Sequence, residues 1–294
     1  MLKKLCLSLF LSICLGISSE AQFVKEYKIA GRSDIDLVQL EFTSYKSTTQ
    51  LRRIKTQDLL YIHGHLAKSN ILPDFKHSFQ KNTVKASLIH KNVESDNLGK
   101  TITSKLFFSE SDFEHSWDIG LVSNYLYELD FNLGMGKADF DLSQLPISNF
   151  KVKSASADVT IRYGSESPNQ VAMDTLLVTL NMGSVELQNA NFTNSKKIIL
   201  EVNYGNIDLN FSDGMPSGCQ VIAAVGGGTI FLKLPPESNP VKIKMKTTPM
   251  CRTSLPKYLK ALDKETYVTK GFNPSDPRLL ELVLDVGVGS VTVE

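Results

Sequence analysis

The sequence predicts an all-β protein built as a β-solenoid-like stack of strand–glycine corner–strand repeats. In the recurring unit, apolar residues alternate with polar ones, a glycine interrupts the alternation, and the alternation then resumes. The units recur about every 20 residues, which is typical of one coil of a solenoid. The clearest copies are centred on Gly183, Gly205, Gly228 and Gly289. Sustained helical periodicity is absent from the chain, which favours the all-β assignment.

Each glycine corner is expected to reverse the chain within two residues. Such a turn generally needs a positive φ, which glycine adopts without a Cβ penalty. The residues that flank a corner, such as Met182 and Val185 or Tyr204 and Ile207, are expected to return to the same buried face. The spacing permits either stacked hairpins or solenoid corners. In both cases a copy buries its apolar face only against its neighbours, so the copies must stack.

The first region, residues 1–21, has the features of a secretory signal peptide. Lys3 and Lys4 precede a short apolar stretch, and small residues stand before Gln22, the expected mature N-terminus. The apolar stretch is shorter than the roughly 20 residues that span a bilayer. Cys14 lacks the small-residue junction of a lipid-anchor site, which disfavours a lipid anchor. We therefore expect a secreted mature chain without a transmembrane segment, in the periplasm or at the cell surface.

Two further regions are expected in the mature chain. Residues 22–118 form an irregular N-terminal β region, interpreted as the start of the same stack. Residues 119–294 contain the clear repeats, with a proline-rich insertion at about 246–280. A short helix is expected around 258–262, inside this insertion.

Charge and motifs exclude several classes of function. The chain has 32 basic and 31 acidic residues, which argues against nucleic acid or a strongly charged membrane surface as the main partner. The glycine-rich segments 134–137 and 226–229 are followed by predicted strands. Phosphate loops need a helix N-terminus, so turns explain both segments. No catalytic residue and no cofactor is predicted.

The outward position beside each corner carries a carboxylate in successive copies. The four residues are Asp139, Asp158, Glu186 and Asp208. Neighbouring strands are about 4.8 Å apart, so stacking in register would place the carboxylates in one column. Like charges that face one another are destabilising unless a cation or basic partner offsets them. The column is a candidate site for a divalent cation such as Ca²⁺, or for a basic or carbohydrate ligand; the alternative is an ordinary solvent-exposed polar row.

Histidines and cysteines give two weaker candidates. His63 and His65 are two residues apart, so on a strand they would share a face and could chelate a metal. No third ligand can be named from the sequence, and ordinary surface histidines are the alternative. Cys219 and Cys251 remain after removal of the signal peptide. Either a disulfide between them or two buried thiols is compatible with the sequence.

The chain resembles a known family in several of its segments. These are WDIGL, LDFNLGMG and DLSQL within residues 117–145, and LVLDVGVGSVTV at 282–293. They resemble the toast-rack domain and the related putative-adhesin β-repeat family of bacterial envelope proteins, a domain of unknown function. The resemblance implies a β-solenoid-like stack without known catalytic residues.

These observations predict a non-enzymatic, secreted or periplasmic protein of the bacterial cell envelope. It would act as an adhesion or interaction scaffold whose unknown partner is an envelope protein or a glycan. One alternative is a polysaccharide-cleaving β-helix enzyme, which would need a basic residue beside the acidic column; Arg162 and Lys233 are the nearest outward candidates. The other alternative is an envelope-stress signalling partner that docks on a membrane sensor through an exposed edge.

Overall fold

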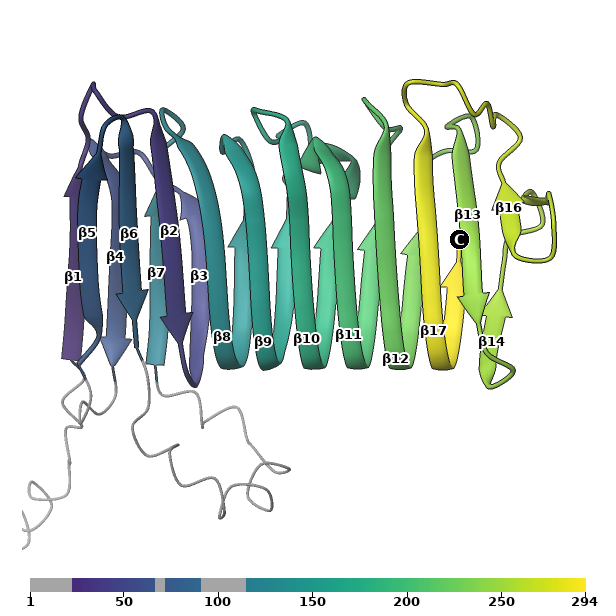
Figure 1. The fold of residues 1–294 in the computed structure, drawn as a ribbon, viewed down its shortest axis with the longest axis horizontal. Coiled ribbons are helices and arrows are strands. Elements are labelled where there is room, and N and C mark those ends of the chain that lie inside the picture. Colours follow the sequence, from purple (N-terminus) through teal and green to yellow (C-terminus); the bar gives the residue numbers. More distant parts are fainter. Residues whose placement is uncertain (1–22, 67–71, 91–114) are drawn as a thin grey trace, which may run out of the picture.

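The computed structural model describes residues 23–66, 72–90 and 115–294, so the expected signal peptide lies outside the described residues. The described chain forms one extended 17-stranded sheet that folds around an apolar core (Figure 1). No helix of these residues is long and apolar enough to cross a membrane. The strands are β1 (Phe23–Ala30), β2 (Leu37–Ser44), β3 (Ser47–Arg53), β4 (Asp58–Leu66), β5 (Asp74–Gln80), β6 (Thr83–Ile89), β7 (His115–Leu121), β8 (Leu126–Asp141), β9 (Ile147–Arg162), β10 (Met173–Gln188), β11 (Ser195–Asn210), β12 (Cys219–Lys233), β13 (Val241–Thr247), β14 (Cys251–Ser254), β15 (Lys260–Ala261), β16 (Thr266–Val268) and β17 (Leu280–Val293).

The repeat unit is a long strand bent once into two arms. Figure 1 shows β8 to β12 and β17 side by side, each turning at the lower edge and returning behind itself. Hydrogen bonds join successive copies in parallel, and the register places Val185, Ile207, Ile230 and Val291 opposite one another. These four side chains are at most 1% exposed. The predicted all-β, solenoid-like stack is confirmed, and parallel pairing between copies rules out stacked hairpins. We call the outer surface of the first arms the front face and that of the second arms the back face.

Glycine is required at the corners for two reasons. Gly183, Gly205 and Gly228 have φ values of 119°, 144° and 146°, a region that other residues rarely adopt. The corners also stack closely, because a Cβ added to Gly205 would lie 1.8 Å from the carbonyl oxygen of Gly183. The expected role of the corner glycines is therefore correct.

The residues that precede the corner glycines are not buried, contrary to our expectation. Met182 is 45% exposed and Tyr204 is 69% exposed, whereas Leu180 and Val202 are the last core residues of their arms. The two arms meet at the corner, so no core remains beneath the residue before the glycine. Its side chain therefore lies at the edge of the stack, in contact with solvent.

The N-terminal strands extend the stack, but not in chain order. β2 pairs with the first arm of β8, and β3 pairs with its second arm, so these two short strands together make one coil. The next coil outward is made by β6 and β7, which come later in the sequence. Antiparallel strands then complete this end: β5 pairs with β6 on the front, and β4 joins β7 to β1 on the back.

The other end of the stack is also out of chain order. β17 lies between β12 on one side and β13 and β14 on the other. β16 pairs antiparallel with both β13 and β15. The expected helix around 258–262 is absent: a turn closed by the Leu259 amide and the Pro256 carbonyl (3.2 Å) leads into β15. Pairing with β16 uses the backbone groups that a helix would need.

Candidate functional site

A groove of about 630 Å³ crosses the front face from β5 to β10. Side chains alternate between core and solvent along each arm, so the outward ones are mainly polar. Lysines and carboxylates from different coils line the groove, among them Lys85, Glu41, Asp130 and Lys151. The groove therefore offers both hydrogen-bond donors and acceptors at positions set by the sheet.

Polar pairs between neighbouring coils hold these groups in place. Gln39 donates through Nε2 to Oε2 of Glu128 at 2.7 Å, which joins β2 to β8. Lys151 of β9 forms an ion pair with Asp130 of β8. Such half-exposed pairs add little stability, but they restrict the side chains to defined positions. The groove is therefore a preorganised polar surface.

An apolar row adjoins the polar groove. Leu177 of β10 lines the groove and lies opposite Ile199 of β11. The same register continues to Ile222 of β12 and Val283 of β17. All four side chains face outward and are partly exposed. The front face thus changes from charged to apolar along the stack.

The predicted acidic column lies on the back face, but its members do not form one row. Glu186 and Asp208 are direct neighbours on β10 and β11. Thr160, not Asp158, stands between Asp139 and Glu186. Asp158 is in the adjacent row, where it accepts a hydrogen bond of 2.6 Å from Oγ of Ser184.

Basic and amide side chains engage part of this row. Arg162 forms ion pairs with Asp139 and, at 3.7 Å, with Asp141. Gln188 donates to Oε1 of Glu186 at 2.6 Å. Burial, reinforced by the neighbouring carboxylate of Glu186, raises the pKa of Asp208. The structure thus unites two of the four predicted carboxylates, and cation binding there stays a prediction.

Neither of the two basic residues considered for an enzyme is an unpaired neighbour of the acidic row. Arg162 is occupied by its two aspartates. Lys233 lies in the row of Asn210, one outward position away from Asp208 along the strand. The groove, in turn, is on the opposite face of the stack from this row. The groove therefore contains neither these basic residues nor the carboxylates of the row.

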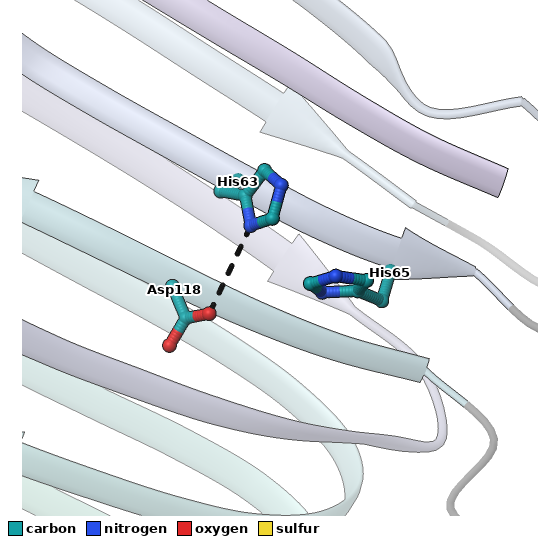
Figure 2. Close-up of side chains that lie close together, drawn as sticks. All are labelled: His63, His65 and Asp118. Carbon is teal, nitrogen blue, oxygen red and sulfur yellow. Dashed lines mark ion pairs between the residues drawn. The ribbon is translucent and has the colours of Figure 1, made fainter. Parts of the chain in front are cut away.

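The acidic row continues along the back face to the histidines. His63 of β4 lies opposite Asp118 of β7, and Gln50 joins Asp118 to Asp139 in the same row. Figure 2 shows that Asp118 and His65 flank His63, and the Nδ1 atom of His63 is 4.0 Å from Oδ2 of Asp118. Sequence reasoning missed Asp118, because its proximity depends on the antiparallel pairing of β4 with β7.

The disulfide that was one of two alternatives for Cys219 and Cys251 is not formed in the structure, where both cysteines are free. Cys219 pairs in register with Leu280, at the start of β17, whereas Cys251 pairs with Gly289 at its corner. At about 3.3 Å per residue, this separation along β17 is roughly 30 Å. A disulfide needs Cα atoms within about 7 Å. Both thiols are free in the structure, but only Cys219 is buried, so the alternative of two buried thiols holds for Cys219 and not for Cys251.

Residues 54–183 match the family model described as the N-terminal domain of toast_rack, DUF2154. This match runs from the approach to β4 up to the corner of β10, and it contains residues 117–145, which carry the resemblance noted in the sequence. Over these residues the chain is therefore similar to the N-terminal toast-rack domain.

Three solved structures are similar over most of this chain. A "putative cell adhesion protein" from Clostridium sporogenes is 14% identical, covers 93% of this chain and 99% of its own, and has a TM-score of 0.49. A "putative adhesin" from Bacteroides fragilis is 12% identical, with coverages of 95% and 100% and a TM-score of 0.36. A "putative lipid binding protein" from Parabacteroides distasonis is 10% identical, with coverages of 94% and 98% and a TM-score of 0.36. No curated protein matches the chain.

Proposed function

We propose that this protein is an exported, non-enzymatic binding scaffold of the bacterial cell envelope, located in the periplasm or at the cell surface. The groove on its front face is the proposed ligand site, and an envelope glycan is the proposed ligand. A protein of the envelope is the other partner class that we consider. The signal-peptide features of residues 1–21 and the toast-rack domain support export and an envelope location.

One observation carries the proposal: the groove contains polar side chains held by partners on neighbouring coils. The Gln39–Glu128 hydrogen bond and the Lys151–Asp130 ion pair fix donors and acceptors across several strands. Ligand sites depend on a few polar groups held in place within a concave surface. Glycans present many hydroxyl groups, and side chains of these kinds bind hydroxyl groups well.

A sedimentation assay with isolated cell-wall polysaccharide tests this proposal. The purified protein should bind, and the double substitution Glu128→Ala and Lys151→Ala should weaken binding about tenfold or more, as expected when about 1.4 kcal/mol of polar contacts is lost. The matched control is Glu201→Ala with Lys246→Ala, which removes the same charges from the front face outside the groove. Equal binding by the groove variant and the control would contradict the assigned site.

Export is tested separately. N-terminal sequencing of protein recovered from the envelope or medium should begin at Gln22. Recovery of uncleaved protein from the cytoplasm would contradict the envelope location. If the wild type binds no polysaccharide and is instead crosslinked to a membrane sensor in cells, the signalling alternative would replace the scaffold proposal.

A further inference from the structure

We propose that His63, His65 and Asp118 form a binding site for a divalent transition-metal ion of the zinc type. The three side chains project from the back face, on the side of the stack away from the groove. The inference goes beyond the scaffold function and does not depend on it.

Strand pairing creates this three-residue cluster. His63 and His65 are two residues apart on β4, so both imidazoles project from the same face. Asp118 lies directly opposite His63 on β7, and His65 lies opposite Ser116. One ligand atom from each member of the cluster can be chosen so that all lie within 4.8 Å of one another. His63 and His65 have ring centroids 4.5 Å apart in an edge-on arrangement (Figure 2).

A small side-chain rotation would bring His63 and Asp118 to the spacing that a metal ion requires. Zinc bonds of about 2.0–2.1 Å place tetrahedral ligand atoms about 3.3 Å apart. The Nδ1 of His63 is 4.0 Å from Oδ2 of Asp118, so these two atoms need to approach by less than 1 Å, roughly the range of a small χ rotation. The side chains of His63 and Asp118 are 21% and 36% exposed, which gives an ion access from solvent.

The backbone beneath the cluster is held by close packing. Gly64, between the two histidines, faces inward against the ring of Trp117, which precedes Asp118. A Cβ on Gly64 would lie 2.4 Å from Cζ3 of that ring, and Trp117 is fully buried. The ligand-bearing segments of β4 and β7 are therefore fixed by the core. Ligands on rigid strands lose little freedom when they bind an ion.

The ligand types select the metal. Two imidazoles and one carboxylate suit Zn²⁺, Co²⁺ and Ni²⁺, whereas Ca²⁺ binds oxygen atoms. Glu26, the next residue of the row, is engaged by Lys28 at 3.0 Å and by the hydroxyl of Tyr61 at 3.2 Å. The cluster itself thus supplies three ligands, and a water molecule or a donor atom from another molecule would take the fourth position.

The test is a Zn²⁺ titration of the purified full-length chain without a polyhistidine tag. Calorimetry or competition with a chromogenic chelator should give one equivalent of Zn²⁺ per chain. His63→Ala and Asp118→Asn should each weaken binding about tenfold or more. His77→Ala is the matched control, because His77 lies on β5, outside the cluster, and its loss should leave the affinity unchanged.

A second readout identifies the ligands directly. Co²⁺ bound to the wild type should show the visible absorption of a four-coordinate ion, and this signal should be absent from a His63→Ala, His65→Ala double variant. Circular dichroism of each variant should match that of the wild type. Absence of Zn²⁺ binding by the wild type, or equal loss of binding in His77→Ala, would overturn the proposal. Retention of wild-type affinity by the folded double variant would also overturn it.

Discussion

The hydroxyl of Tyr127 donates a hydrogen bond of 2.8 Å to the carbonyl oxygen of Leu59 and accepts one of 3.2 Å from the amide of Val122. Tyr127 lies on the first arm of β8, and Leu59 lies on β4, which belongs to the back of the stack. Burial raises the pKa of this hydroxyl, so it stays protonated. One buried group therefore joins the two faces at the N-terminal end.

Tyr127→Phe is expected to lower the free energy of unfolding by about 1–3 kcal/mol, because it leaves a buried carbonyl and a buried amide without their partner. The control is Tyr204→Phe at the exposed corner, which should change stability by less than about 0.5 kcal/mol. Urea unfolding measured by circular dichroism gives both values. Equal effects of the two substitutions would contradict the buried bridge.

Adjacent glycines at one corner should respond differently to alanine. Gly228 has a φ of 146°, and an added Cβ would lie 1.7 Å from the carbonyl oxygen of Gly205. Gly228→Ala should therefore destabilise the protein by at least about 2 kcal/mol. At Gly227 an added Cβ would only make an ordinary contact of 3.4 Å with the ring of Tyr204.

Gly227→Ala should thus change stability by less than about 1 kcal/mol. Melting temperatures and urea midpoints of the two variants, measured side by side, check this difference. A mild effect of Gly228→Ala would show that the corner can be rebuilt without a positive φ.

Asp208 should make stability depend on pH. Burial and the carboxylate of Glu186 raise its pKa above the ordinary 3.8, so the folded state holds this proton more tightly than the unfolded state. The contribution of Asp208 to the free energy of unfolding is therefore greatest below pH about 3.8. It falls as the pH rises through the raised pKa, and it remains at the lower value above that pKa. The substitution Asp208→Asn removes the loss of stability that follows ionisation of this carboxyl group.

The variant Asp208→Asn should be more stable than the wild type by about 0.2–1 kcal/mol at pH 7, the range for facing like charges. Near pH 3 the two proteins should be equally stable. Glu201→Gln is the control, because its neighbours in the row, Thr179 and Ala224, are uncharged. A stability gain that is the same at pH 3 and pH 7 would contradict the raised pKa of Asp208.

The two thiols should differ in reactivity. Cys219 is 4% exposed, and burial raises its pKa to about 12. Cys251 is partly exposed, although burial raises its pKa too. Iodoacetamide should therefore modify Cys251 at least about tenfold faster in the folded protein, because access and thiolate fraction govern the rate. Peptide mass spectrometry measures this ratio, and unfolding in urea should abolish it. A Cys219–Cys251 crosslinked peptide would contradict the structure.

Local pattern made the repeat predictable, because each corner needs glycine and each arm alternates between core and solvent. The register was harder to predict where that pattern weakens. β9 has Ala157 at the place of the corner glycine, so counting along this copy put Asp158 in the acidic row instead of Thr160. This error of two residues keeps the side chain on the outward face but moves it into the adjacent row.

Contacts between distant segments could not be predicted from the sequence. The cluster of His63 with Asp118 depends on antiparallel pairing of β4 with β7, and no local signal encodes that partner. The same holds for the coil of β2 and β3, which lies inside that of β6 and β7. Two parallel strands that are not joined by a short turn carry little sequence signal that identifies them as neighbours.

The position of β17 has a mechanical consequence. A pulling force on this strand acts on a segment that is clasped on both sides, by β12 and by β13 with β14. To detach from the sheet, β17 must break two parallel hydrogen-bond ladders at once. Its detachment also exposes apolar side chains of both neighbours to solvent. Assembly meets the reverse constraint, since β13 and β14 have no docking partner in the stack until a later part of the chain arrives. This end of the stack therefore resists mechanical unfolding through β17, which is hydrogen-bonded on both sides and joins the stack after β13 and β14 have been made.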